Sequence, residues 1–495
     1  MKKVYLLFLG MVMFNASCSK DNEPEVVTVT LNSEVNEFIW EGMNYWYFWQ
    51  ADQPDLADTR FKTTDDFNKY LNSYNSPEDL FNDLVYQPGV TDDFSWYIPD
   101  VDEQLNSFNG IKESYGIGFP RRLIRPNPDT EDIVIFIAYV VAGSPADIAG
   151  LKRGDIINRV DGVTMNVDNA SIINKVFSEK SISLGLANIE NGNVTSIEGE
   201  INLNAVVIPV SPIQHFQVIQ EGGKKIGYLV YNGFTRTYNG ELNDVFNSFK
   251  SENITELILD LRYNGGGSVL TSAFLASMIN GNVPANSQTF ARLQYNAKRD
   301  GNNGVNFPFF NEVYLYDKKS GDNTGQVPSN RIKSLTKLYV ITGQGTASAS
   351  EMIINGLRPY MEVILVGEKT VGKNEGSITV VDSPSPYTNL DNRNKNHTIG
   401  MQPIVFQVFN SKDQSDYTFG FDPEFLVEEF RFVSDIKPFG DPNEALLRAT
   451  LDVILGASSK KGTLEPNMKM FKTEKEISFP KFNYDMYLLP QEQQN

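Results

Sequence analysis

A serine at the start of a predicted helix is the first candidate for nucleophilic chemistry. Ser348 lies in the segment GQGTASASE, residues 343–351, between an apolar strand at 338–341 and an apolar helix that runs to Leu357. A helix dipole and free N–H groups favour negative charge that develops at such a position. Serine, threonine and glutamate in a first helical turn also serve as ordinary caps. The segment alone is therefore consistent with a nucleophile or with a helix cap.

A glycine-rich loop follows another predicted buried strand. Residues 256–267 read ELILDLRYNGGG, so three glycines close the strand at 256–261. Glycines expose backbone N–H groups with no Cβ in the way, and such a loop can form one side of an oxyanion hole. A triple glycine is also common in ordinary turns and in close packing.

A serine nucleophile needs a base, and the candidate bases are lysines. The sequence contains no G-x-S-x-G elbow, and neither His215 nor His397 lies in a context that indicates a triad. A lysine can replace histidine where burial favours its neutral amine. Lys373 follows the predicted strand at 363–366, and parallel neighbouring strands would bring its turn and the serine turn to one sheet edge. Lys369 in the same turn is a second candidate.

Composition excludes several other kinds of chemistry. The chain has 495 residues, which allows two to four domains, and 41% of them are hydrophobic, which excludes a largely disordered chain. With 62 acidic and 43 basic residues its formal net charge is −19, which argues against a nucleic-acid partner. Two histidines and one cysteine argue against zinc sites, iron–sulfur clusters and disulfide frameworks. We therefore expect a site that works without a metal or a cofactor.

The N-terminus is typical of an exported protein. Two lysines precede the apolar run Val4–Phe14, and two small residues then precede Cys18, the single cysteine. This pattern resembles a bacterial lipoprotein signal, with residues 1–17 removed, Cys18 lipidated and residues 18–34 forming a tether. We expect a lipid anchor in a membrane of a Gram-negative cell envelope, on the periplasmic side or at the cell surface. The alternative is an ordinary secretory signal with an incidental cysteine.

Two small domains are expected before the main one. Residues 35–108 are rich in aromatic residues and predict a helical domain, and residues 109–204 predict a small β-barrel. The string GSPADIAGLKRGDIINRVDG in the second segment resembles a PDZ domain of the bacterial protease type. The upstream loop resembles the carboxylate-binding loop of such a domain, where backbone N–H groups can cradle a peptide C-terminus. Its residues are Tyr115, Gly116, Ile117, Gly118 and Phe119. The alternative is a β-domain that packs without binding peptide.

The largest segment predicts a layered α/β domain. Residues 205–457 alternate apolar strands with helices. The stretch at about 283–335 is rich in glycine, asparagine and serine and shows little periodicity, so we expect a surface insertion there. The tail, residues 458–495, is charged and then apolar at 487–490, and we expect it to pack back on the protein.

The order of these segments resembles a known family of peptidases. A PDZ domain, LILDLRYNGGG, GTASASE and VGEKTVGK follow one another as in the carboxyl-terminal processing proteases of family S41, over roughly residues 35–457. The resemblance implies that Ser348 is the nucleophile and that Lys373, 25 residues later, is the general base. It also implies an α/β multidomain fold, with an αββ peptidase core of the crotonase and ClpP type, an N-terminal helical domain and a PDZ β-barrel.

The resemblance extends to the groups around the dyad, with one departure. It places the oxyanion hole at the N–H of Ala349 and at an N–H of Gly265 or Gly266. Many members carry a glutamine four residues after the lysine, where this chain has Ser377. Either Ser377 orients the lysine less well, or Glu375 or another group takes over, and a Glu375 that points inward would raise the pKa of the lysine and hinder a general base.

These observations together predict a serine endopeptidase with a Ser–Lys dyad that cleaves exported proteins or peptides. Its PDZ domain would recognise substrate C-termini or gate the site. One alternative is a catalytically degenerate lipoprotein that binds peptides through the PDZ domain. Another is an acyl-CoA enzyme of the crotonase type, which the export signal and the PDZ segment argue against.

Overall fold

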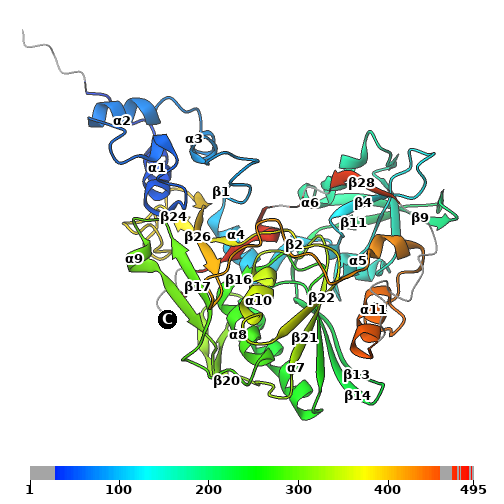
Figure 1. The fold of residues 1–495 in the computed structure, drawn as a ribbon. Coiled ribbons are helices and arrows are strands. Elements are labelled where there is room, and N and C mark those ends of the chain that lie inside the picture. The colour runs from blue at the N-terminus through cyan, green and yellow to red at the C-terminus, as the bar shows by residue number, and fades with distance from the viewer. Residues whose placement is uncertain (1–27, 457–470, 477–478, 480, 490–491, 493–495) are drawn as a thin grey trace, which may run out of the picture.

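The computed structural model, shown in Figure 1, describes most of the chain, namely residues 28–456, 471–476, 479, 481–489 and 492. The predicted signal peptide, residues 1–17, and Cys18 lie outside the described residues. No helix in the described part of the chain is long and apolar enough to cross a membrane.

The N-terminal region is helical and packs on the main domain through a strand. Its helices are α1 (Glu34–Trp46), α2 (Thr64–Leu71), α3 (Pro77–Leu84) and α4 (Val101–Phe108), with a 3-10 turn η1 (Pro54–Leu56). The first three begin after a serine or threonine whose hydroxyl accepts a backbone N–H of the first turn. Strand β1 (Trp96–Ile98) pairs antiparallel with β25 (Gly400–Gln402) far along the chain. Figure 1 shows α1–α3 at one end of the molecule.

The second region is a small β-domain with a core of its own. Its short elements are β2 (Ile111–Ser114), β3 (Ile117–Gly118), β4 (Arg122–Arg125), β5 (Ile135–Phe136), β6 (Tyr139–Val140), α5 (Pro145–Ile148), β7 (Ile156–Val160), β8 (Val163–Thr164), η2 (Ala170–Asn174), α6 (Lys175–Ser178), β9 (Ser181–Glu190), β10 (Asn193–Ser196), β11 (Ile201–Asn204) and β12 (Val206–Pro209). An Asp-Gly turn joins β7 to β8, with positive φ at Asp161 and Gly162. Leu123, Ile157 and Leu184 lie in the centre of its core.

A mostly parallel sheet forms the centre of the third region. Its strand order is β13 (Ile213–Glu221), β14 (Lys224–Tyr231), β15 (Glu256–Asp260), β21 (Lys337–Thr342), β22 (Glu362–Gly367) and β27 (Phe425–Leu426), and only β13 is antiparallel to its neighbour. One face packs on α7 (Asn239–Ser251), α8 (Val269–Ile279) and α10 (Ala349–Leu357), and the other on α11 (Ala445–Ile454). The 3-10 turns η3 (Arg236–Tyr238) and η4 (Glu429–Asp435) flank it.

A second sheet lies against the helices and includes the stretch that we expected to be a surface insertion. Its order is β16 (Gly267–Ser268), β29 (Met486–Tyr487), β23 (Glu375–Ser377), β26 (Ile404–Phe409), β17 (Thr289–Tyr295) and β18 (Val305–Pro308). Residues 283–335 differ from the expectation, since they also form α9 (Asp300–Asn303), β19 (Glu312–Tyr316) and β20 (Asn323–Pro328). Phe290, Leu293 and Phe309 are fully buried. The polar residues between these apolar positions concealed the strand pattern from the sequence.

The C-terminal segment returns to two separate places, as its apolar residues led us to expect. Strand β28 (Phe471–Glu476) pairs antiparallel with β4 of the small β-domain, and Figure 1 shows it in red beside that strand. After η5 (Lys481–Tyr484), β29 lies parallel between β16 and β23. The remaining strand, β24 (Val380–Val381), pairs with β25.

Candidate active site

Ser348 occupies a strained turn between β21 and α10. Its φ is 63° and its ψ is −118°, a conformation that residues with a Cβ rarely adopt. The side chain is fully buried, and its Oγ has no hydrogen-bond partner among the described residues. A strained backbone and an unpartnered buried hydroxyl both fit a nucleophile, and the same turn forms a capping box in which Glu351 accepts the N–H of Ser348.

Glu351 joins the serine turn to the lysine turn. Its carboxylate accepts hydrogen bonds from the backbone N–H groups of Ser348 at 2.9 Å, Gly372 at 2.7 Å and Lys373 at 2.8 Å. The hydroxyl of Thr370 donates to the same carboxylate at 2.6 Å. Burial raises the pKa of Glu351 to about 7, and these four hydrogen bonds oppose the shift. The sequence suggested only a capping role for this glutamate, whereas the structure makes it the link between the two candidate catalytic residues.

Of the two candidate lysines, Lys373 is the buried one. Its side chain is fully buried, and its Nζ lies 2.9 Å from Oδ1 of Asp485 and 4.6 Å from the ring centroid of Phe94. Lys369 is half exposed, and its Nζ lies 3.4 Å from Oδ1 of Asp422. Burial and the link through Glu351 therefore place Lys373, and not Lys369, in the interior with Ser348.

The polar groups beyond Lys373 differ from both sequence-based candidates for its orienting partner. Asp485 holds Nζ, and the hydroxyl of Ser377 donates to both oxygens of Asp485, at 2.8 and 3.0 Å. Nε2 of Gln402 donates to Oγ of Ser377 at 3.0 Å. Ser377 thus reaches the lysine through Asp485. Glu375 lies outside this chain of contacts, and burial raises its pKa to about 7 although the Lys373 ammonium opposes the shift.

The glycine loop touches the serine turn directly. Gly266 has a φ of 124°, and a Cβ built on it would lie 2.8 Å from Cβ of Ser348 and 3.2 Å from the backbone N of Ala349. The N–H of Gly266 donates to Oδ1 of Asn264 at 2.9 Å, and the N–H of Gly267 donates to the backbone O of Asp485 at 2.7 Å. Of the predicted oxyanion groups, Gly266 and Ala349 are therefore neighbours, and the N–H of Gly266 is engaged by Asn264.

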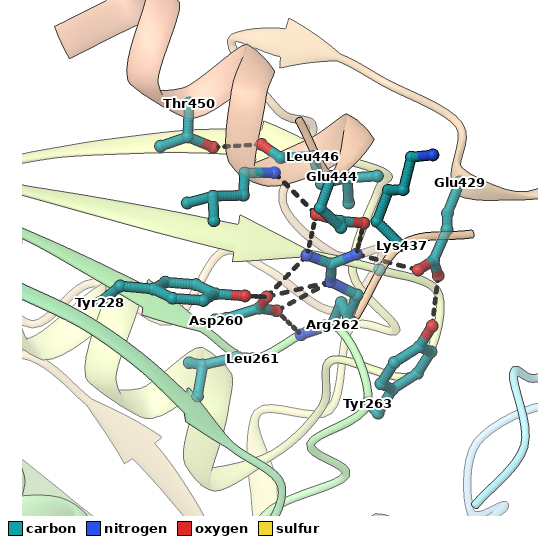
Figure 2. A network of polar contacts seen from close by, with 12 residues as sticks. Tyr228, Asp260, Leu261, Arg262, Tyr263, Glu429, Lys437, Glu444, Leu446 and Thr450 are labelled. Carbon is teal, nitrogen blue, oxygen red and sulfur yellow. Dashed lines mark hydrogen bonds and ion pairs between the residues drawn. The ribbon is translucent and has the colours of Figure 1, made fainter. Parts of the chain in front are cut away.

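A buried network behind the glycine loop fixes its position and holds the small β-domain in place. Arg262 contacts Asp260 at 2.7 Å, Glu444 at 2.8 Å and Glu429 at 2.9 Å, and Figure 2 shows these contacts as dashed lines. Arg262 is 2% exposed, so its charge is balanced almost entirely by these carboxylates. The Arg262 guanidinium also lowers the pKa of Glu444 to about 2, even though burial acts in the opposite direction. Arg153 of the small β-domain joins the network by donating to Glu429, which Arg262 also contacts, at 2.7 Å.

The predicted peptide-binding loop and the glycine loop line the same groove. Residues 115–119 and Gly265–Gly267 line a cavity of about 1020 Å³, together with Asn483 and Tyr484. Gly116 has a φ of 81°, and a Cβ there would clash with the side chain of Ser144. The loop is therefore built around a glycine that no other residue could replace without a shift.

Both histidines have other surroundings, in keeping with the ordinary roles expected for them. His397 lies 3.0 Å from Asp382, and His215 packs against the ring of Tyr228.

Comparison with known proteins identifies the domains. The family model described as peptidase family S41 matches residues 225–384, the one described as the peptidase S41 N-terminal domain matches 34–96, and a PDZ domain model matches 136–173. The chain therefore contains a peptidase S41 domain, an S41 N-terminal domain and a PDZ domain. It has the fold class expected from its sequence, with an N-terminal helical region, a PDZ domain and a mixed α/β peptidase domain.

Individual relatives agree with this assignment. The chain is 28% identical over 264 residues to a carboxyl-terminal-processing protease of Synechocystis, with 53% of each chain covered. It is 25% identical to the chloroplastic carboxyl-terminal-processing peptidase 3 of Arabidopsis thaliana, covering 54% of this chain and 48% of the relative. The chain thus spans about half the length of these curated relatives. A solved structure from Bacteroides fragilis, assigned to the S41 proteases, is 28% identical, with a TM-score of 0.63 over 85% of this chain and 98% of that one.

Proposed function

We propose that the protein is a serine endopeptidase that uses a Ser348–Lys373 dyad to cleave exported proteins or peptides. The observation that carries the proposal is Ser348 itself, a buried serine at positive φ whose hydroxyl has no partner among the described residues. Glu351 joins its turn to that of Lys373, and the names of the curated relatives agree with peptide-bond hydrolysis.

The reaction follows from the chemistry of these groups. A neutral Lys373 takes the proton of Ser348 as Oγ attacks the scissile carbonyl carbon, and the resulting oxyanion forms beside the N–H of Ala349 and the glycine loop. Collapse of the tetrahedral intermediate expels the amine, which takes the proton from Lys373, and leaves an acyl-enzyme. Water then attacks the ester with Lys373 again as base, which releases the acid and restores Ser348.

The PDZ domain and the export signal complete the proposal. The loop at 115–119 would bind a substrate's C-terminal segment or gate the groove that it shares with the glycine loop. Cys18 would carry a lipid that holds the enzyme at a membrane of a Gram-negative envelope. Mass spectrometry of the N-terminal peptide purified from a bacterial membrane fraction would test the anchor, and an unmodified Cys18 would refute it.

The decisive experiment compares residues 26–495 with the variants Ser348→Ala, Lys373→Ala and Lys369→Ala. Cleavage of an unstructured protein such as casein and labelling by a fluorophosphonate probe are measured together. We expect Ser348→Ala to lose labelling and about 10³-fold or more in cleavage, and Lys373→Ala to lose about 10²- to 10⁴-fold. Lys369→Ala is the matched control and should retain activity. Peptide binding without labelling or cleavage would instead identify a degenerate peptide-binding protein.

A further inference from the structure

The C-terminal segment follows the groove that joins the PDZ loop to the catalytic turns. Its described residues, 471–476, 479 and 481–489, are called the docked segment below. Phe479, Lys481, Asn483 and Tyr484 line the same cavity as residues 115–119 and Gly265–Gly267. One stretch of chain thus contacts both places where the proposed function requires a peptide.

At the PDZ domain, the docked segment pairs with a strand edge that suits a peptide ligand. Strand β4 comes soon after the loop at 115–119, and β28 adds to it antiparallel, with Phe471 opposite Arg125 and Lys472 opposite Ile124. Strand addition beside a carboxylate-binding loop is the way such domains take peptides. Farther along, Phe479 packs on the PDZ core, with its ring centroid 5.1 Å from that of Phe177.

At the catalytic turns, the docked segment contacts the glycine loop and the lysine strand together. The N–H of Gly267 donates to the O of Asp485 at 2.7 Å, and the N–H of Leu488 donates to the O of Ser377 at 3.1 Å. A Cβ on Gly265 would clash with the backbone O of Asn483. The segment is therefore in backbone contact with the loop that we assign to the oxyanion hole.

The charge of Asp485 conflicts with catalysis in this arrangement. Its Oδ1 lies 2.9 Å from Nζ of Lys373, and both side chains are fully buried. Nζ of Lys373 is therefore engaged by Asp485, whereas the proposed reaction needs this amine free to take the proton of Ser348.

We propose that the docked segment is a tethered pseudosubstrate that occupies the peptide site and keeps the dyad inactive until a substrate displaces it. This inference rests on the proposed function and extends it to regulation and ligand class. The slot between β16 and β23 takes an extended peptide, and an acidic side chain at the position of Asp485 binds tightly because it meets the Lys373 ammonium. Such peptides act as inhibitors, whereas peptides with a neutral residue there are substrates.

The test uses the chain of residues 26–495 with Asp485→Asn, which preserves the shape of the side chain and removes its charge. Asp102→Asn is the matched control, because Asp102 forms an exposed ion pair with Arg393. We expect Asp485→Asn to be labelled by the fluorophosphonate probe and to cleave casein at least fivefold faster than the parent protein, and Asp102→Asn to behave like the parent. A synthetic peptide with the sequence of residues 481–492 should slow the labelling of Asp485→Asn, and the same peptide with asparagine at the Asp485 position should do so less.

The sign of the effect separates this inference from its rival. If Asp485 instead positions Lys373 for catalysis, Asp485→Asn lowers kcat and the labelling rate. Either this decrease or unchanged rates of cleavage and labelling overturn the proposal. Absence of labelling in every variant refutes the nucleophilic role of Ser348. In that case hydrogen exchange still tests whether Asp485 holds the docked segment in place. The Gly267 and Leu488 amides should exchange faster in Asp485→Asn than in Asp102→Asn. Equal exchange rates overturn the proposal.

Discussion

Arg153 of the PDZ domain and Arg262 of the peptidase domain donate hydrogen bonds to the same oxygen of Glu429, at 2.7 and 2.9 Å. Both guanidinium groups also reach Oε1 of Glu444, at 3.3 and 2.8 Å. Arg262 follows β15 and precedes the glycine loop, so the PDZ domain is tied to the backbone that lies beside Ser348. Figure 2 shows the peptidase side of this network.

Removing the two arginines should have unequal costs. Arg262→Met leaves three buried carboxylates without their main cation and should destabilise the protein by about 3–5 kcal/mol. Arg153→Met leaves Glu429 and Glu444 paired with Arg262 and should cost about 1–3 kcal/mol, the value of hydrogen bonds to charged groups. Thermal and urea unfolding would measure both. Arg393→Met, which removes an exposed ion pair, is the control and should cost under about 1 kcal/mol. An equal cost for Arg153→Met and Arg262→Met would contradict this order.

A methyl group on Gly266 should disable catalysis. The new Cβ would clash with the backbone O of Asp485 and press on Cβ of Ser348, and a displacement of the nucleophile by about 1 Å can cost about 10²-fold in rate. We expect kcat for casein cleavage to fall by about that factor in Gly266→Ala. Gly199→Ala is the matched control, because Gly199 also has a positive φ but has open space around it. Equal activity of the two variants would show that the glycine loop does not border the reacting atoms.

The local parts of the site were predictable from the sequence because the residues that form them are close together in the chain. The serine turn, the glycine loop and the lysine turn each follow a buried strand, and the parallel order β15–β21–β22 brings the three turns to one edge. The helix after Ser348 was predicted and is α10, whereas the antiparallel strand β13 was not predicted.

The partners of Lys373 were not predictable, because they come from distant segments. Asp485 lies 112 residues farther along the chain, and its approach depends on β29 entering the sheet between β16 and β23. Phe94 comes from the N-terminal region, on the turn that precedes β1. No local pattern encodes such pairings, since a two-residue strand carries no periodicity. The strands at 289–328 were missed for the related reason that asparagine and glycine interrupt their apolar alternation.

The last prediction concerns Glu375, whose pKa burial raises to about 7 from an ordinary value of 4.5. A carboxyl group whose pKa is higher in the folded state stabilises the protein fully below pH 4.5, and this contribution is lost as the pH rises through 7. Above pH 7 the folded protein must hold a largely buried carboxylate, at a cost of about 1–3 kcal/mol.

Glu375→Gln removes that titration. The variant and the parent protein should differ little near pH 4.5, and the variant should become the more stable of the two as the pH rises to 8. Urea unfolding at pH 4.5, 6, 7 and 8 measures the difference. Glu312→Gln, the same change at an exposed position on β19, is the control and should show no such trend. A stability difference that stays constant from pH 4.5 to 8 would mean that Glu375 ionises in the folded protein as readily as in the unfolded chain.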